Sequence, residues 1–277
     1  MEQKIILGLD ISTHCTGISI VYVNETGECK PIIVTHLRPK IPTKIKGIEA
    51  LFLKCNLFME KLGEILINNN LYSNVNGVKE CKITDIVIEE PLLLSNNAET
   101  VASLLRYNGM VALSVYNMIG ILPEFISSYE ARKYGMPVLM AVRKFDKKGN
   151  ILPLKKITKA VNTNDLVLFG AYPFDCAKKH IIWNYISEKY PEIQWVYNKD
   201  GDLKNENFDA SDSLICVLGY VNKLLYGDKG IEVVCCSKDK RDGYTIITYS
   251  YNFCNEMFTK SIEVPDEETV TPDKTES

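Results

Sequence analysis

Four carboxylates stand where apolar segments of the sequence end or begin. Asp10 closes the apolar run of residues 4–10, and Glu89 closes a second run just before Pro91. Asp209 and Asp212 are three residues apart at the start of a long apolar segment, so on a helix both would point from one face. Each residue alone has an ordinary explanation, because Asp often follows a strand in a turn and acidic residues complement the start of a helix.

Taken together, the four carboxylates suit one kind of chemistry. Clustered carboxylates repel one another, so a cation is needed to hold them together. Oxygen ligands without His or Cys favour Mg²⁺ or Mn²⁺. Two such ions about 3.5–4 Å apart can clamp the attacking and the leaving oxygen of a phosphodiester. The set therefore predicts catalytic, metal-binding carboxylates if the fold brings these residues to one place: Asp10, Glu89, Asp209 and Asp212.

The elements around these residues predict a fold that does so. Residues 4–10 and 17–24, with "PIIVTHL", predict three antiparallel strands; "ITDIVIEEP" and "PEFISSY" predict a fourth and a fifth strand. Long amphipathic helices are expected at residues 44–70 and in "NAETVASLLRYNGMVALSVYNMIG". The order is typical of an α/β fold with a mixed five-stranded sheet flanked by helices. If the first and fourth strands are neighbours, Asp10 and Glu89 lie close together, and a helix across the sheet can add Asp209 and Asp212.

The rest of the chain predicts appendages to this main domain. Two further helices are expected in "CAKKHIIWNYISEKYP" and "FDASDSLICVLGYVNKLLYG", and strand, turn and strand in "IEVVCCSKDKRDGYTIITYSYNF". The expected organisation is a main domain of residues 1–230 with a basic insertion at about 136–173, a C-terminal hairpin at 231–260 and a disordered acidic tail at 261–277.

Composition narrows the class of protein further. With 277 residues, 46% of them hydrophobic, the chain can bury a sizeable core. The nine Cys show no CxxC spacing and the three His are well separated, which argues against a zinc site and for reduced thiols. No apolar stretch is long enough to span a bilayer, and the beginning of the sequence lacks the shape of a signal peptide. We therefore expect a cytoplasmic protein with no membrane partner, and the many Asn, Lys and Ile favour a bacterial or phage-infected host.

Charge is distributed unevenly along the chain. The net charge is −3, but residues 132–180 carry eleven Lys and Arg against three Asp, a net +8, which leaves −11 for the remainder. A basic segment on an acidic protein is a candidate surface for a polyanion such as DNA. The alternative is a solvated face, the usual role of Lys-rich segments.

Four stretches in order resemble the RuvC-type Holliday junction resolvases of the RNase H-like superfamily, and they cover most of residues 4–226. The first stretch is similar to the family's opening strand, turn and strand, and the second to its segment of strand, Glu and helix. The third is similar to its fifth strand with the basic turn that follows, and the last to its closing D-x-x-D helix. The stretches are "GLDISTHCTGISIV", "IVIEEPLLLSNNAETVASLLRYNGMVALSV", "FISSYEARKYGMP" and "FDASDSLICVLGYV".

The resemblance implies an activity and a set of roles. The chain would be a crossover-junction endodeoxyribonuclease, a homodimer that cuts branched DNA with two Mg²⁺ or Mn²⁺ ions per active site. Asp10 would bridge the ions, Glu89 would share one, and Asp209 with Asp212 would complete the ligand shells. The expected DNA-binding residues, taken from the turn after Asp10 and from the basic side chains, are Ser12, Thr13, Arg106, Arg132, Lys133, Lys155, Lys156, Lys178 and Lys179.

Three departures from the family pattern, and two alternatives, stay open at this stage. Ile11-Ser12 replaces the usual Pro-Gly after the first Asp, Leu92–Leu94 stand where the family often has an aromatic residue, and the insertion and C-terminal hairpin lie outside the family core. One alternative is a nucleotide-binding protein of the actin-like and sugar-kinase group, which would need a second lobe and a Gly-rich adenosine motif. The other is a non-catalytic DNA-binding module on the same fold.

Overall fold

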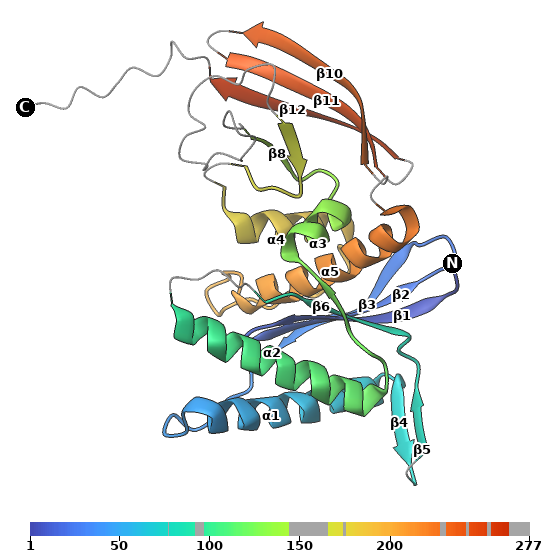
Figure 1. Ribbon diagram of the computed structural model, residues 1–277, viewed down its shortest axis with the longest axis vertical. Helices are drawn as coiled ribbons and strands as arrows, with labels where there is room; N and C mark the ends of the chain where they lie inside the picture. The colour runs from blue at the N-terminus through green and yellow to red at the C-terminus, as the bar shows by residue number, and fades with distance from the viewer. Residues whose placement is uncertain are drawn as a thin grey trace, which may run out of the picture. The chain divides into compact units, whose positions relative to one another are not determined.

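The computed structural model falls into two compact units, which are described separately here (Figure 1). The first consists of Met1–Met136 with Ala177–Val221, and the second of Pro137–Cys176 with Asn222–Ser277. The residues that the structure describes are 1–76, 78–91, 97–143, 166–173, 176–227, 231–241, 244–253 and 256–265.

The first unit is built on the mixed five-stranded sheet that the sequence predicts. Strands β1 (Lys4–Ile11), β2 (Thr16–Val23) and β3 (Cys29–Leu37) pair antiparallel, whereas β6 (Asp85–Glu89) and β7 (Glu124–Ile126) continue the sheet in parallel beside β1. The strand order is β3-β2-β1-β6-β7. Strands β1, β2 and β6 are buried along most of their length, as expected for strands covered on both faces. The expected neighbourhood of the first and fourth strands is thus confirmed.

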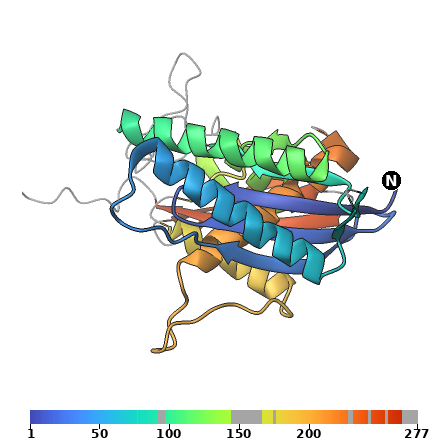
Figure 2. The same cartoon turned by 90° about the horizontal axis from the view of Figure 1, so that it is seen from below.

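Helices cover both faces of this sheet (Figures 1 and 2). Helices α1 (Gly47–Asn68) and α2 (Ala98–Ile119) bury Phe58, Leu62 and Val111 in a core with Leu7 and Leu9. The side chain of Asn97 caps α2 by accepting from the amides of Glu99 and Thr100, and Gly120 in the left-handed conformation ends it. The opposite face carries α3 (Ser128–Gly135), α4 (Lys178–Lys189) and α5 (Glu206–Tyr226).

Glycines allow α5 to approach its neighbours closely. A Cβ at Gly17 of β2 would overlap the backbone carbonyl of Asp209, and one at Gly8 of β1 would overlap Val217. On the other side of the helix, a Cβ at Gly219 would lie 2.6 Å from the carbonyl oxygen of Ala131 in α3. These contacts press the first half of α5 onto the sheet and α3 onto α5, so they set the depth at which the side chains of α5 meet those of the strands.

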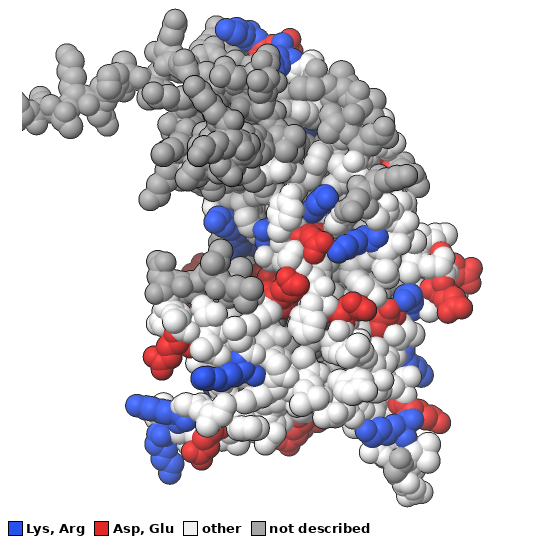
Figure 3. All heavy atoms as spheres, viewed as in Figure 1, with Lys and Arg blue, Asp and Glu red and all other residues white. Residues whose placement is uncertain are grey.

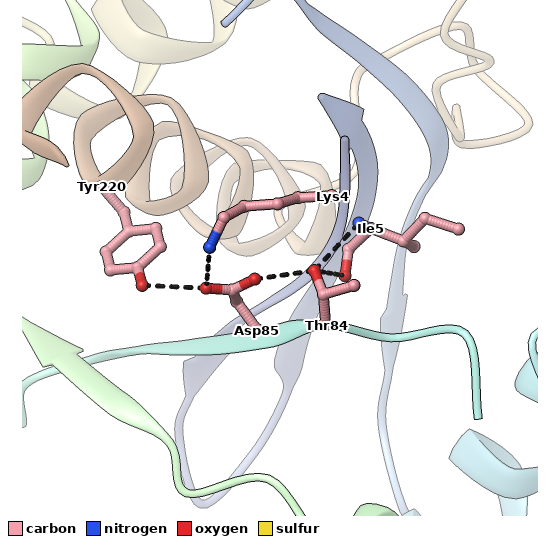
Figure 4. Close-up of polar contacts among 5 residues, drawn as sticks. All are labelled: Lys4, Ile5, Thr84, Asp85 and Tyr220. Carbon is pink, nitrogen blue, oxygen red and sulfur yellow. Dashed lines mark hydrogen bonds and ion pairs between the residues drawn. The ribbon is translucent and has the colours of Figure 1, made fainter. Parts of the chain in front are cut away.

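A polar cluster joins the start of β6 to β1 and α5 (Figure 4). Asp85 accepts from Lys4 Nζ at 2.6 Å and from the hydroxyl of Tyr220 at 3.1 Å through one oxygen. Its other oxygen accepts from Thr84 at 2.6 Å, and the backbone amide of Thr84 donates to the carbonyl of Ile5 at 2.8 Å. Every partner comes from an element that packs at this end of the sheet, so the cluster fixes β1, β6 and α5 together.

The second unit joins two separated parts of the chain in one core. Strands β8 (Met140–Arg143) and β9 (Leu166–Phe169) pair antiparallel, and Met140 and Phe169 pack with Tyr251. The hydroxyl of Tyr251 also donates to the carbonyl of Pro137 at 2.7 Å, and Lys260 Nζ to that of Val138 at 2.8 Å. The insertion and the C-terminal segment therefore form one unit, where the sequence suggested two appendages.

The C-terminal hairpin has a third strand. Strand β10 (Ile231–Arg241) pairs with β11 (Tyr244–Phe253) as expected, and β12 (Glu256–Pro265) then pairs with β11 along its length. Phe258 of β12 stacks on Tyr251 with ring centroids 5.7 Å apart, which places this strand in the core of the unit. The expected start of the tail at 261 is thus corrected, because strand pairing runs to Pro265. Residues 144–165 and 266–277 lie outside the described residues, and with them the middle of the insertion and the rest of the tail.

Two elements of the first unit were not predicted. A hairpin of β4 (Tyr72–Val75) and β5 (Val78–Cys81) lies between α1 and β6, and its turn contains Asn76 at a φ of 54°. Helix α3 begins where a basic turn was expected, because the hydroxyl of Ser127 accepts from the amide of Glu130 at 3.2 Å and caps it. None of the helices in the described ranges is both long and apolar enough to cross a membrane.

Candidate active site

The four predicted carboxylates come from three elements of the first unit. Asp10 is the penultimate residue of β1 and Glu89 is the last residue of β6. The parallel register pairs Leu9 with Ile88, so these two carboxylates follow paired residues at the same edge of the sheet. Asp209 and Asp212 lie in the first two turns of α5. Gly17, which pairs with Asp10, is the residue whose missing side chain admits the backbone of Asp209.

The carboxylates lie close enough to perturb one another's ionisation. Burial raises the pKa of Asp10 well above its usual value, and the charges of Glu89, Asp212 and Asp209 raise it further. Burial likewise raises the pKa of Asp212 to about 8, with added repulsion from Glu89 and Asp209. Burial is also the main reason that the pKa of Glu89 rises to about 7. Full ionisation of the cluster is therefore disfavoured unless a cation binds there.

Two basic side chains face this cluster. Arg132 of α3 lowers the pKa values of Glu89 and Asp212, against the larger effect of burial. Lys179 of α4 acts in the same direction on Asp10, Asp209 and Asp212. Both cations thus act on Asp212, and both belong to the set that the sequence suggested for DNA contact.

Two thiols also contact the cluster, and neither was singled out from the sequence. Cys216 Sγ donates to Oε2 of Glu89 over 3.7 Å, and the thiol of Cys15 lies beside Asp209. His36 of β3, which pairs with Gly17, lies near Asp209; burial lowers the pKa of His36, whereas Glu206 and Asp209 raise it. The strand register aligns His36 with Gly17 and Asp10 across β3, β2 and β1, but no pattern in the sequence marks the thiols.

The turn after Asp10 uses its hydroxyls internally. Ser12 Oγ donates to the carbonyl of Cys15 at 2.7 Å and accepts from its amide at 3.1 Å. Thr13 Oγ1 lies 3.2 Å from Nδ1 of His14, and the carbonyl of Thr13 accepts from Lys54 Nζ at 2.6 Å. These contacts are those of ordinary turn residues, and a phosphate-binding role for Ser12 and Thr13 stays a prediction.

The remaining predicted DNA-binding residues are placed more widely. Lys133 Nζ donates to the hydroxyl of Tyr134 at 3.0 Å, and Lys178 is exposed at the start of α4. Arg106 is exposed on α2, on the sheet face opposite α5. Lys155 and Lys156 lie outside the described residues. On the face shown in Figure 3, basic and acidic side chains alternate over the described residues, so a continuous basic surface is not visible there.

The donor set fits hard divalent cations in chemistry and charge. Four carboxylates that repel one another offer only oxygen ligands, which is the preference of Mg²⁺ and Mn²⁺. Within the described residues, however, no group of three or more His, Cys, Asp or Glu side chains is arranged to hold a metal ion. The carboxylates are therefore gathered at one edge of the sheet without converging on a single point.

Comparison with known proteins gives structural similarity alone. No protein-family model and no curated protein matches the sequence. Thermus thermophilus RuvC in complex with a Holliday junction substrate is similar over 80% of this chain and 97% of its own, at 8% identity and a TM-score of 0.46. A second T. thermophilus RuvC structure covers 81% and 97%, at 11% identity and 0.44. An Aquifex aeolicus Ppx/GppA family member covers 95% and 52%, at 10% identity and 0.31. Similarity at this level does not assign an activity.

Proposed function

We propose that this protein is a metal-dependent endonuclease that cuts branched DNA, with four-way junctions as the expected substrate. The observation that carries the proposal is the gathering of Asp10, Glu89, Asp209 and Asp212 from β1, β6 and α5 at one edge of the sheet. A buried set of carboxylates with raised pKa values, left unneutralised by its own surroundings, is a frequent mark of a functional site.

In this proposal the four carboxylates would hold two Mg²⁺ or Mn²⁺ ions, and the ions would supply an activated water and stabilise the leaving oxygen of the phosphodiester. Asp10, whose pKa is raised by the charges of the other three carboxylates, would be the central ligand. Glu89 and Asp212 would ionise fully when the cations bind, because a nearby positive charge lowers a carboxylate pKa. Since the carboxylates do not converge in the structure, binding would also draw their side chains inward.

Arg132 and Lys179 would hold the DNA phosphate at this site. Both face the carboxylates, and a scissile phosphate beside the cluster needs positive charge on its outer side to offset the nearby acids. Arg132 can make a bidentate contact with phosphate, whereas Lys179 acts as a point charge. The other basic residues, among them Lys155, Lys156 and Lys178, are proposed to bind phosphates farther along the DNA.

The direct test is cleavage of labelled four-way, three-way, flap and linear duplex DNA side by side, with Mg²⁺, with Mn²⁺ and with chelator. We expect metal-dependent cleavage of the branched substrates, and Asp10→Asn should lose it while still shifting the four-way junction in a gel. Near-normal cleavage by Asp10→Asn would remove this site from the proposal. Binding without cleavage under every condition would favour a non-catalytic DNA-binding module.

We also propose that the chain acts as a homodimer, because symmetric cleavage of a four-way junction needs two active sites. Leu105, Leu113 and Tyr116 lie on the solvent side of α2 with exposed fractions of 41%, 60% and 42%, and they are the proposed contact with a second copy. Sedimentation of the wild type and of Leu113→Glu tests this. A wild type that is monomeric at all concentrations would contradict the proposal.

A further inference from the structure

Two buried thiols link the carboxylate cluster across its elements. We infer that Cys216 and Cys15 are positioning residues, whose S–H groups orient Glu89 and Asp209 for a divalent cation. The inference rests on the proposed function, because it assigns these thiols a role at the same site. It goes beyond that function in making the affinity of the site for its cation depend on two side chains that are not ligands themselves.

Cys216 connects α5 to the end of β6. It is fully buried and lies four residues after Asp212 and seven after Asp209, so all three share one face of the helix. Its Sγ reaches Oε2 of Glu89 at 3.7 Å, within hydrogen-bonding range for sulfur. Glu89 is the last residue of β6, and its backbone pairs with Ile126 of β7. Strand pairing holds the backbone of Glu89 but not its side chain, so the thiol is a contact that restricts the carboxylate itself.

Cys15 makes the corresponding connection from the turn between β1 and β2. It is 5% exposed, and its thiol lies beside Asp209 of α5. The backbone of Cys15 is held by Ser12, whose hydroxyl contacts both its amide and its carbonyl. The turn that follows Asp10 is thus tied to the helix that carries Asp209. Cys216 thus links α5 to the end of β6, and Cys15 links the turn between β1 and β2 to α5.

The thiols act as donors rather than as thiolate ligands. A cysteine thiol ordinarily has a pKa of about 8.5, so it keeps its proton at neutral pH and can donate to a neighbouring carboxylate. A thiol is a weak donor, so it can restrict the orientation of a carboxylate while leaving most of its charge for a cation. Partners of this kind, one step beyond the ligands, typically change metal affinity about 10- to 100-fold when they are removed.

The experiment measures Mn²⁺ binding to the DNA-free protein by titration calorimetry, together with melting of the metal-free protein. Cys216→Ala and Cys15→Ala should each weaken Mn²⁺ binding about 10-fold or more. Cys216→Ser keeps a donor at the position and should recover part of the affinity. The matched control is Cys55→Ala, which removes a buried thiol in α1 that lies 3.6 Å from Ser114 Oγ on the opposite face of the sheet. It should melt with a similar loss but bind Mn²⁺ as the wild type does.

The outcomes separate the inference from the proposed function. If Asp10→Asn abolishes Mn²⁺ binding but the two Cys→Ala variants bind like Cys55→Ala, the thiols have no positioning role and only this inference is overturned. Equal weakening in Cys216→Ala and Cys216→Ser would also overturn it, because packing rather than donation would then explain the loss. A wild type that binds no Mn²⁺ would overturn the proposed function along with the inference.

Discussion

The two ends of strand β6 place carboxylates against the same neighbours, β1 and α5, in opposite electrostatic states. Asp85, at the start of β6, is buried in a way that alone would raise its pKa. Hydrogen bonds from Lys4, Thr84 and Tyr220 nevertheless lower it. Burial raises the pKa of Glu89, four residues later, to about 7. The charge of Arg132 and the hydrogen bond from Cys216 lower this pKa but do not offset the effect of burial.

The difference separates a structural carboxylate from one suited to bind a cation. Asp85 has all the donors it needs, so ionisation stabilises the fold and an added cation would find no open oxygen of comparable benefit. At the other end, each further ionised carboxylate makes the metal-free fold less stable. A site that destabilises the metal-free fold is best explained by a ligand whose binding offsets the loss of stability. Four predictions test this contrast.

The largest effect is expected from matched Asp→Asn changes at the two ends. Asp212→Asn should reduce cleavage of a four-way junction by at least about 1,000-fold, because the variant loses a proposed metal ligand. It should nevertheless melt at a higher temperature than the wild type in chelator, because Asn removes a group whose ionisation the fold opposes. Asp85→Asn should keep cleavage but destabilise the fold by about 1–3 kcal/mol, because Lys4 loses its partner. Changes of the same sign in both melting temperatures would refute the contrast.

The next largest effect concerns how closely α5 packs on the sheet. Gly17→Ala would put a methyl group into the carbonyl of Asp209, so the helix must shift; we expect a loss of about 1–3 kcal/mol or more and a large loss of cleavage. Gly109→Ala in α2 meets no atom within 4 Å and should be neutral or stabilising by up to about 1 kcal/mol. Denaturant unfolding and cleavage assays of both variants check this. Wild-type cleavage by Gly17→Ala would mean that the depth of α5 does not matter to the site.

A smaller effect is expected in the pH dependence of stability without metal. The pKa values of Glu89 and Asp212 are raised to about 7 and about 8 from 4.5 and 3.8, so the folded state binds their protons more tightly. Their stabilising contribution is complete below about pH 4 and is lost as pH rises through 7 and 8, at up to about 1.4 kcal/mol per pH unit for each proton. Asp85 has a lowered pKa, so its ionised form stabilises the folded protein at pH values above the usual pKa of an Asp. This contribution is lost as the pH falls.

Melting in chelator between pH 5 and 8.5 tests this pH dependence. The wild type should lose stability over that range, Asp212→Asn should lose less, and saturating Mg²⁺ should reduce the slope, because a bound cation keeps the carboxylates ionised. A wild-type curve that is flat in chelator would show that the carboxylates are not mutually destabilising.

The smallest effect is expected at the hydroxyl of Tyr220. Tyr220→Phe removes one of the donors to Asp85 and should cost about 0.5–1.5 kcal/mol without affecting cleavage. Tyr197→Phe, at an exposed position between α4 and α5, is the control and should be neutral. If Tyr220→Phe reduced cleavage strongly, the two ends of the strand would not be independent.

The sequence predicts what depends on local pattern and misses what depends on contacts between distant residues. The buried strands and the long helices have clear periodicity, and the positions of Asp10 and Glu89 at strand ends follow from it. The start of helix α3, which carries Arg132, could also have been predicted, because Ser127 and Glu130 form the S-x-x-E pattern of a helix start. The sequence Asn-Gly at positions 76 and 77 similarly favours a hairpin turn, and β4 pairs with β5 around it. Nothing local, by contrast, marks Cys216 as a neighbour of Glu89, since 127 residues separate them.

The composition of the second unit has a consequence for synthesis. Its core joins Met140 and Phe169 to side chains of β11 and β12, so it cannot close until the last strand has left the ribosome. The chain between Phe169 and Pro265 takes on the order of 5–19 s to make at about 5–20 residues per second. The first unit is complete once Val221 has emerged, so it can fold during that interval. Throughout the interval Met140 and Phe169 lack their partners in β11 and β12, and a ribosome stalled within β10 would leave them available to chaperones.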